Sequence, residues 1–233
     1  MIELNDSIIN ILLQERTLDD KLQIDVKNTI PRYMKSLDVQ KDRTKAKDEV
    51  FTPVNIVKKM NDAFDVNYIV DYKDYIDRKV IEATCGEAPF LITRYDVSTG
   101  EKIPQIDRVG LLDRKLQRIP DDISKSEWIA LATRSLQATY GYEWQEDYIF
   151  LARKNMLLNV IEYYVDKFKE LPKQDVIEEW ATIISYNIFR MDGVTLCIPE
   201  TNIKTKVMNW ETKKMENFDG SKDVLREIEQ QLF

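Results

Sequence analysis

The residues best suited to chemistry gather around the stretch 80–91, Val-Ile-Glu-Ala-Thr-Cys-Gly-Glu-Ala-Pro-Phe-Leu. Residues 80–83 predict a short buried strand, Gly86 allows a tight turn, and the apolar residues that follow predict a helix starting over 87–95. A strand that ends in an acid before a glycine turn is typical of a nucleotide-cofactor site. An ordinary turn between a strand and a helix would look much the same, because dinucleotide fingerprints carry three glycines and this stretch carries one.

Acidic residues accompany three successive predicted strands. Glu82 lies in the first strand, Glu143 follows the second, and Asp192 follows the third. In an open parallel sheet a ligand lies beyond the carboxyl ends of the strands, so Glu143 and Asp192 are expected to face one crevice beside the glycine turn. A carboxylate suits a vicinal diol such as that of a ribose, and a second one suits the amine of a base. The chain has 41 acidic residues, which makes chance placement the alternative, but the ordered placement favours a cofactor site.

A second candidate segment precedes the glycine turn. Thr52 is predicted to cap a helix with Pro53 at its first position, and an apolar stripe of Ile56, Val57 and Met60 follows. The amino end of such a helix could meet an anion or a hydroxyl of a cofactor. An ordinary capped helix would show the same residues.

Composition excludes several classes of function. The chain has 233 residues, of which 43% are hydrophobic and 32% charged, with a net charge of −7, so a uniformly basic nucleic-acid surface is excluded and only a local patch is possible. It has no histidine and two cysteines, Cys85 and Cys197, which excludes the usual zinc sites and histidine-based catalysis. We therefore expect no metal. The absence of a long apolar run predicts no membrane span and a cytoplasmic protein.

Helices and strands alternate from residue 80 onward, which predicts an α/β fold with parallel strands joined by right-handed crossovers, in a partial doubly wound arrangement. An insertion is expected at about 96–124 because it contains two turn signals. The predicted strands are 80–84, 138–142 and 185–190, and the predicted helices are 5–15, 18–36, 125–138, 145–168 and 174–184.

Residues 1–47 are predicted to form an N-terminal helical extension, before a main domain over 48–233. A mildly basic run lies between residues 32 and 48, with six basic residues against three acids. Such a run is typical of a solvated connector, and a DNA contact is the alternative.

Four stretches, in order, resemble the cofactor half of an adenine-specific DNA methyltransferase, of the kind found as modification subunits of restriction systems. They are Glu49-Val-Phe-Thr-Pro53, the turn Glu82-Ala-Thr-Cys-Gly-Glu-Ala-Pro-Phe-Leu91, Tyr140-Gly-Tyr-Glu-Trp-Gln-Glu-Asp147 continuing to Leu151-Ala-Arg153, and Asn187-Ile188 with Met191-Asp192-Gly193. Together they cover roughly residues 45–195.

The resemblance implies a Rossmann-like methyltransferase fold with S-adenosylmethionine in the crevice. It places Thr52 and Pro53 near the methionine end of the cofactor, Glu82 and Gly86 near its amino-acid part, Glu143 on the ribose and Asp192 on the adenine amine. The full set of cofactor-binding residues that it implies is Phe51, Thr52, Pro53, Glu82, Thr84, Cys85, Gly86, Glu143, Trp144, Asp192 and Gly193.

Two departures from the family stand out. Ala88 replaces the second glycine of the turn and Pro89 follows it. The catalytic motif, an Asn or Asp followed by Pro-Pro and an aromatic that stacks on the flipped base, is absent, and Ile198-Pro199-Glu200 is the nearest proline segment. Three hypotheses follow: a methyltransferase whose catalytic loop comes from a partner or an unrecognised segment, an inactive relative that serves as a cofactor-binding or protein-interaction module, and a structural protein with a vestigial pocket.

The resemblance also implies a partner. In the family the first strand is central, so the far edge of 80–84 is expected to be uncovered unless the insertion or a hairpin of 204–210 and 214–218 pairs with it. In the family's order Phe218-Asp219 corresponds to the opening of a fourth strand, and 224–233 predicts a short charged helix. We expect a second chain or self-association at this edge, with DNA as a further candidate partner.

Overall fold

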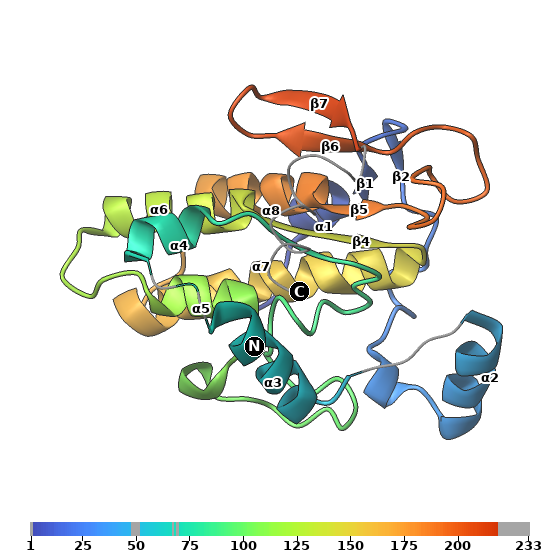
Figure 1. The fold of residues 1–233 in the computed structure, drawn as a ribbon, viewed down its shortest axis with the longest axis horizontal. Coiled ribbons are helices and arrows are strands. Elements are labelled where there is room, and N and C mark those ends of the chain that lie inside the picture. Colours follow the sequence, from blue (N-terminus) through green and yellow to red (C-terminus); the bar gives the residue numbers. More distant parts are fainter. Residues whose placement is uncertain (1, 48–51, 67, 69, 219–233) are drawn as a thin grey trace.

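The computed structural model describes residues 2–47, 52–66, 68 and 70–218. Phe51, Asp219 and the helix predicted over 224–233 lie outside the described residues. In chain order, Figure 1 shows the elements α1 Asp6–Leu12, β1 Gln14–Glu15, β2 Asp20–Lys21, a 3-10 turn at Arg32–Met34, α2 Leu37–Lys47, α3 Val54–Asp65, α4 Tyr72–Asp77, β3 Val80–Glu82, a 3-10 turn at Gln105–Asp107, α5 Leu111–Gln117, α6 Lys125–Gln137, β4 Thr139–Glu143, α7 Glu146–Phe168, α8 Gln174–Asn187, β5 Ile188–Arg190, β6 Lys206–Asn209 and β7 Lys214–Asn217.

The centre of the fold is a parallel sheet with the strand order β3-β4-β5. The register aligns Glu82 with Gly141 and Glu143 with Arg190, so the carboxyl ends of the strands meet at one edge. The mixed α/β class and the parallel strands predicted from the sequence are confirmed, although the sheet is small. The connections from β3 to β4 and from β4 to β5 step in the same direction across the sheet. Right-handed crossovers of this kind put their helices on the same face of the sheet.

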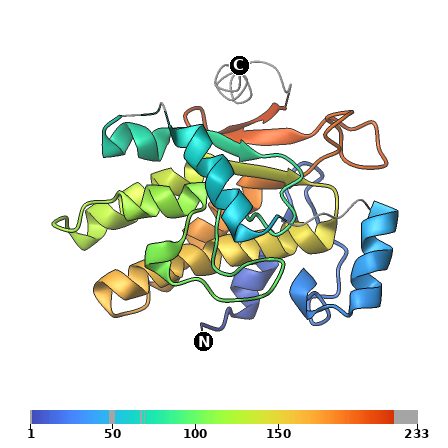
Figure 2. The same cartoon turned by 60° about the horizontal axis from the view of Figure 1, so that its bottom comes forward.

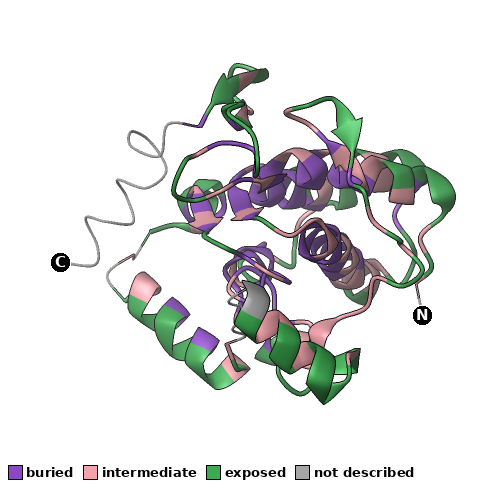
Figure 3. Ribbon diagram, turned by 90° about the vertical axis from the view of Figure 1, so that its right-hand side faces the viewer, coloured by how far each residue is buried: buried purple, intermediate pink, exposed green. Residues whose placement is uncertain are grey.

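The two faces of the sheet are covered by different material. Val80, Cys85 and Ile188 belong to a large core that contains residues of α1, α5, α6, α7 and α8. Tyr140 and Phe189, which alternate with that set along the strands, pack in a second cluster with Phe218 and with partly buried side chains of the β6–β7 hairpin. Figure 3 shows the buried residues (purple) concentrated where the central helices and strands meet. The described sheet thus has helices on one face and a hairpin on the other, so the predicted doubly wound arrangement, with helices on both faces, is not found in the described sheet.

Arg153 of α7 joins the N-terminal segment to this core. Its guanidinium is fully buried and donates to the carbonyl oxygens of Leu12 at 2.6 Å, Ser185 at 2.9 Å and Ile188 at 2.8 Å. The pKa of Arg153 is lowered to about 9, chiefly by burial. Leu12 itself is fully buried in the large core, so α1 packs as part of the same body as the sheet.

Three sequence-based element predictions are wrong. Residues 18–36 form β2, irregular backbone and a 3-10 turn, because Leu22 is the last buried residue before Val57 among the described side chains and no apolar face supports a helix there. Residues 87–95 form turns in place of a helix start. The strand predicted over 185–190 begins at Ile188, since 185–187 continue α8.

The expected hairpin exists, but it does not extend the central sheet. β6 and β7 form an antiparallel pair of their own, in which Met208 lies opposite Met215. Within the described residues β3 is therefore an edge strand of the parallel sheet. Val80 donates its N–H to Ala138 O at 3.0 Å, on the β4 side. The backbone groups of Ile81 face the opposite, outer side, because alternate residues of a parallel strand face opposite neighbours.

Candidate functional site

The turn after β3 has an unusual backbone. Thr84, Gly86 and Ala88 have φ values of 47°, 53° and 62°, so three residues of five lie in the left-handed region. Glycine adopts this region freely, whereas each of the other two costs about 1–2 kcal/mol. Strained backbone of this kind is concentrated at functional sites and is held in place by its surroundings. Ala88 thus adopts a backbone conformation that glycine would adopt without strain.

Glu82 holds the second half of this turn. Its side-chain oxygens accept from Phe90 N at 3.3 Å and Leu91 N at 3.2 Å. Burial raises the pKa of Glu82 well above its usual value, the two backbone bonds oppose that shift, and the nearby Glu143 adds to it. Glu82 is only 8% exposed, so its carboxyl group organises the turn from within.

Glu143 connects the end of β4 to the turn after β3. One carboxylate oxygen accepts from Gly86 N at 2.9 Å, and the other accepts from Trp144 N at 2.8 Å and Gln145 N at 3.0 Å. A second link is made by the Cys85 N–H, which donates to Tyr142 O at 2.8 Å. A carboxylate offers about four acceptor positions, so one position remains on the oxygen that faces Gly86. The structure therefore brings Gly86 and Glu143 together, as the sequence predicts.

The side chain of Cys85 lies away from this crevice. Cys85 is 1% exposed and belongs to the large core. A Cβ atom on Gly141 would lie 3.2 Å from the Cys85 Sγ, which explains the glycine in the Tyr-Gly-Tyr-Glu stretch. Burial also raises the pKa of the Cys85 thiol well above its usual value. The thiol is thus a packing group beneath the turn.

A cleft of about 490 Å³ opens where β4 and β5 end. That volume lies within the range of small-molecule sites. Trp144 contributes an indole that is 39% exposed, which is high for a residue next to the buried Glu143. The lining residues are Gln23, Ile24, Arg43, Trp144, Gln145, Glu146, Asp147, Arg190 and Glu200. A half-exposed indole beside charged groups can stack on a planar ring.

Asp192 and Gly193 lie at the same end of the sheet. The N–H of Met191 donates to Glu143 O at 3.1 Å, which fixes the start of this segment beside β4. Asp192 accepts from Val194 N and Thr195 Oγ1, both at 2.8 Å, and these bonds lower its pKa. A Cβ atom on Gly193 would lie 3.0 Å from the Tyr142 hydroxyl. In this structure the Asp192 carboxylate is engaged by its own turn.

The helix cap predicted at Thr52 is wrong. Helix α3 begins at Val54, and Pro53 occupies the capping position. The side chain in that position makes no capping hydrogen bond. Asp96 takes that role from the loop after the glycine turn, because its carboxylate accepts from Val54 N at 2.9 Å. Hydrogen bonds from Ser98, Val54 and the following loop outweigh the burial that would raise the pKa of Asp96, and the pKa is lowered. A carboxylate of the protein therefore already occupies this helix end.

Two residues near the site, Glu87 and Arg190, were not among the site residues predicted from the sequence. Glu87 is 1% exposed and accepts from Arg32 N at 2.7 Å and from the Tyr95 hydroxyl. Arg190 lines the cleft and pairs with Glu146 at 2.8 Å, while its Nε is buried with no hydrogen-bond partner among the described residues. Arg190 directly follows two apolar strand residues and lies in register with Glu143. This position could have indicated from the sequence that Arg190 belongs to the site.

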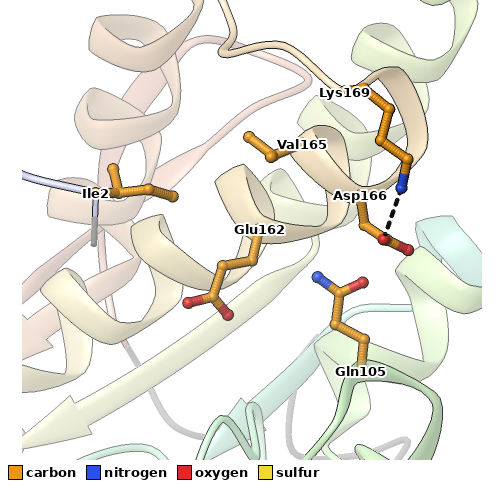
Figure 4. A pocket seen from close by; sticks show the side chains of 6 residues that line it. All are labelled: Ile2, Gln105, Glu162, Val165, Asp166 and Lys169. Atoms are coloured by element: carbon orange, nitrogen blue, oxygen red, sulfur yellow. Dashed lines mark hydrogen bonds and ion pairs between the residues drawn. The ribbon is translucent and has the colours of Figure 1, made fainter.

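A different pocket, of about 470 Å³, lies along the last turns of α7. Figure 4 shows Glu162, Val165 and Asp166 on the helix, with Gln105 across from them and Lys169 paired with Asp166 at 3.0 Å. A helix of this length extends about 35 Å at 1.5 Å per residue. Because α7 starts directly after β4, this pocket lies at the opposite end of the molecule from the glycine turn. It contains none of the predicted site residues.

The described ranges contain no group of three or more cysteine and acidic side chains arranged to hold a metal ion. No helix in the same ranges is long and apolar enough to cross a membrane. The chain matches no family model, and no curated protein or solved structure matches it either.

Proposed function

We propose that the crevice at the carboxyl ends of β3, β4 and β5 binds S-adenosylmethionine, and that the chain is a DNA adenine methyltransferase-like protein of the restriction-modification type. The observation that carries this proposal is the hydrogen bond between the Glu143 carboxylate and Gly86 N, with Trp144 half exposed beside it. This arrangement brings together an acid suited to a ribose, a strained turn suited to close approach of the cofactor to the backbone, and an indole suited to an adenine ring.

The residues fit part of such a cofactor. The remaining acceptor position on Glu143 can take one ribose hydroxyl, and a second hydroxyl requires release of Gly86 N. Trp144 offers its exposed indole to the adenine, and base stacking on an aromatic side chain contributes about 1–3 kcal/mol. Asp192 and the amino end of α3 contribute less than the sequence suggests, because both are engaged by protein groups. The bound cofactor would supply the methyl group for transfer.

The catalytic group is unassigned. Ile198 accepts from Thr201 N at 3.1 Å and donates to Ile203 O at 2.8 Å, so the Ile198-Pro199-Glu200 segment is a tight turn of its own. Glu200 from this turn lines the cleft. In the proposed enzyme the Pro-Pro-aromatic loop comes from a partner chain or an unrecognised segment, and the outer edge of β3 is the proposed place for such a partner.

A second candidate function is a cofactor-binding regulatory or protein-interaction module without catalysis. The observation that favours it is the absence of the Pro-Pro-aromatic motif from the whole sequence. Methyl transfer to adenine-containing DNA, measured with the protein alone and with candidate partner chains, separates the two functions. Transfer under either condition favours the enzyme, whereas binding of cofactor without transfer favours the module.

The cofactor proposal is tested by calorimetric titration of S-adenosylmethionine into the wild-type protein and Glu143→Gln. The substitution keeps the size of the side chain and removes its charge, and a hydrogen bond to a charged group contributes about 1.5–3 kcal/mol, so we expect roughly 10- to 150-fold weaker binding. Glu170→Gln is the matched control, since Glu170 is an exposed partner of Lys125 outside the crevice. Equal affinities for Glu143→Gln and wild type would reject the assigned role of Glu143.

A further inference from the structure

The segment 32–44 contacts both the glycine turn and the first turn of α7. On one side, the N–H of Arg32 donates to Glu87 in the glycine turn at 2.7 Å. On the other, Lys35 and Arg43 pair with Asp147 at 3.4 Å and 2.9 Å, in the first turn of α7. Gly86 directly precedes Glu87, and Glu143 lies three residues before the start of α7. The segment thus connects the two places between which the proposed ligand lies.

Aromatic contacts reinforce both attachments. The cationic groups of Lys35 and Arg43 lie 4.6 Å and 4.9 Å from the ring centre of Tyr148, on α7. Tyr33 packs edge to face on Tyr95, with ring centres 5.3 Å apart. Figures 1 and 2 both show α2 beside the end of the molecule where β4 finishes and α7 begins.

Apart from the Tyr33–Tyr95 contact, these attachments are polar. Among the described side chains from residue 23 to residue 45, none is buried, and Met34, Leu37 and Val39 are 57%, 72% and 46% exposed. A segment with no buried apolar anchor opens locally at a small fraction of the free energy of global unfolding. The side chains of these ion pairs are only partly exposed, at 10% for Lys35, 20% for Arg43 and 23% for Asp147, so salt screens the pairs only in part. The segment is therefore held in place without a buried apolar side chain of its own among those described, which favours its local release.

We propose that residues 32–44 form a strap that closes over the crevice and is released, by breaking the Asp147 ion pairs, to admit and discharge the ligand. Arg43 belongs both to the strap and to the lining of the cleft, so movement of the strap changes the cleft itself. The strap as such does not depend on which ligand binds, and only its gating of S-adenosylmethionine rests on the proposed function.

The test is amide hydrogen exchange, followed by mass spectrometry, on the full chain. Asp147→Asn removes the shared anion of both ion pairs, and Asp166→Asn is a matched control because it removes an exposed ion pair at the far end of the same helix. We expect exchange of residues 32–44 to become roughly 5- to 30-fold faster in Asp147→Asn, and to rise with salt in the wild type. The exchange rates of peptides from α7 and α8 should be unchanged, which would show that the variant is folded.

Unchanged exchange of 32–44 in Asp147→Asn, or exchange insensitive to salt, would overturn the strap. A second readout is the rate of S-adenosylmethionine association by stopped-flow tryptophan fluorescence, which should increase in Asp147→Asn and not in Asp166→Asn. Equal association rates in the two variants would overturn the gating role. Complete absence of binding, with exchange accelerated as expected, would reject the proposed cofactor and leave the strap standing.

Discussion

Lys115 gives a prediction whose sign and size follow from the structure. Its ammonium group is buried on α5 and donates to Arg78 O at 2.6 Å, Ala138 O at 3.0 Å and Thr139 Oγ1 at 3.3 Å. These acceptors precede β3 and begin β4, so Lys115 joins the amino ends of the two strands. Burial without a close anion lowers its pKa from 10.5 to about 7.

The substitution Lys115→Met isolates the effect of this charge on stability. Between pH 7 and 10.5 the unfolded chain binds more protons at Lys115 than the folded chain, so this group makes the wild type more stable as pH rises and less stable as it falls. Integrating from pH 7 to pH 9 gives about 2 kcal/mol, since one pKa unit corresponds to about 1.4 kcal/mol. Tyrosine and cysteine titrations are common to both proteins and cancel in the difference.

The assay is urea unfolding of both proteins at pH 7, 8 and 9. We expect the free energy of unfolding of the wild type, minus that of Lys115→Met, to increase by about 2 kcal/mol across this range. The variant should fold, because Ala138 O keeps its bond from Val80 N and Met has a similar length. A difference that stays constant with pH would refute the argument that Lys115 is desolvated without compensation.

Two further stability predictions concern the support of the glycine turn. Gly110→Ala should destabilise the fold by about 2–3 kcal/mol in urea unfolding, because the added Cβ would lie 2.4 Å from the backbone oxygen of Leu91, although the backbone of Gly110 is itself ordinary. A loss below 0.5 kcal/mol would contradict it. Asp96→Ala should cost about 1–2 kcal/mol by removing the cap of α3, whereas Thr52→Ala should cost less than about 0.5 kcal/mol. Equal costs in thermal or urea unfolding would show that Asp96 does not act as the cap.

The sequence was most informative where periodicity and burial agree. Helix α7 and strand β4 lie where the apolar pattern predicts them, because both are buried along most of their length. The contact between Gly86 and Glu143 was predictable as well, since parallel strands align their carboxyl ends.

Long-range polar contacts could not be predicted from the sequence. Asp96 caps α3 from 42 positions along the chain, which no local cap pattern indicates. Arg153 holds carbonyl groups of α1 and α8 with its buried guanidinium, although its position in Leu-Ala-Arg reads as an ordinary helix residue. The helix predicted over 18–36 was wrong for a related reason. The sequence does not indicate that polar contacts with distant residues, and not an apolar face, hold this segment.

The side of the crevice that remains open was also beyond sequence reasoning. The resemblance placed Glu143 on the ribose and Asp192 on the adenine amine, and included Trp144 in the cofactor-binding set. In the structure Asp192 is engaged by Val194 and Thr195, Glu143 keeps one acceptor position, and Trp144 is 39% exposed. Which group is available depends on the bonds of neighbouring backbone, and these follow only from the folded turns.

The most direct test of the central claim is titration of S-adenosylmethionine into the wild-type protein and Trp144→Ala, with binding heat measured for both. We predict saturable binding at one site in the wild type, weakened roughly 5- to 150-fold in Trp144→Ala through loss of about 1–3 kcal/mol of stacking. No binding by the folded wild-type protein would contradict the account, and would leave the crevice without its proposed cofactor.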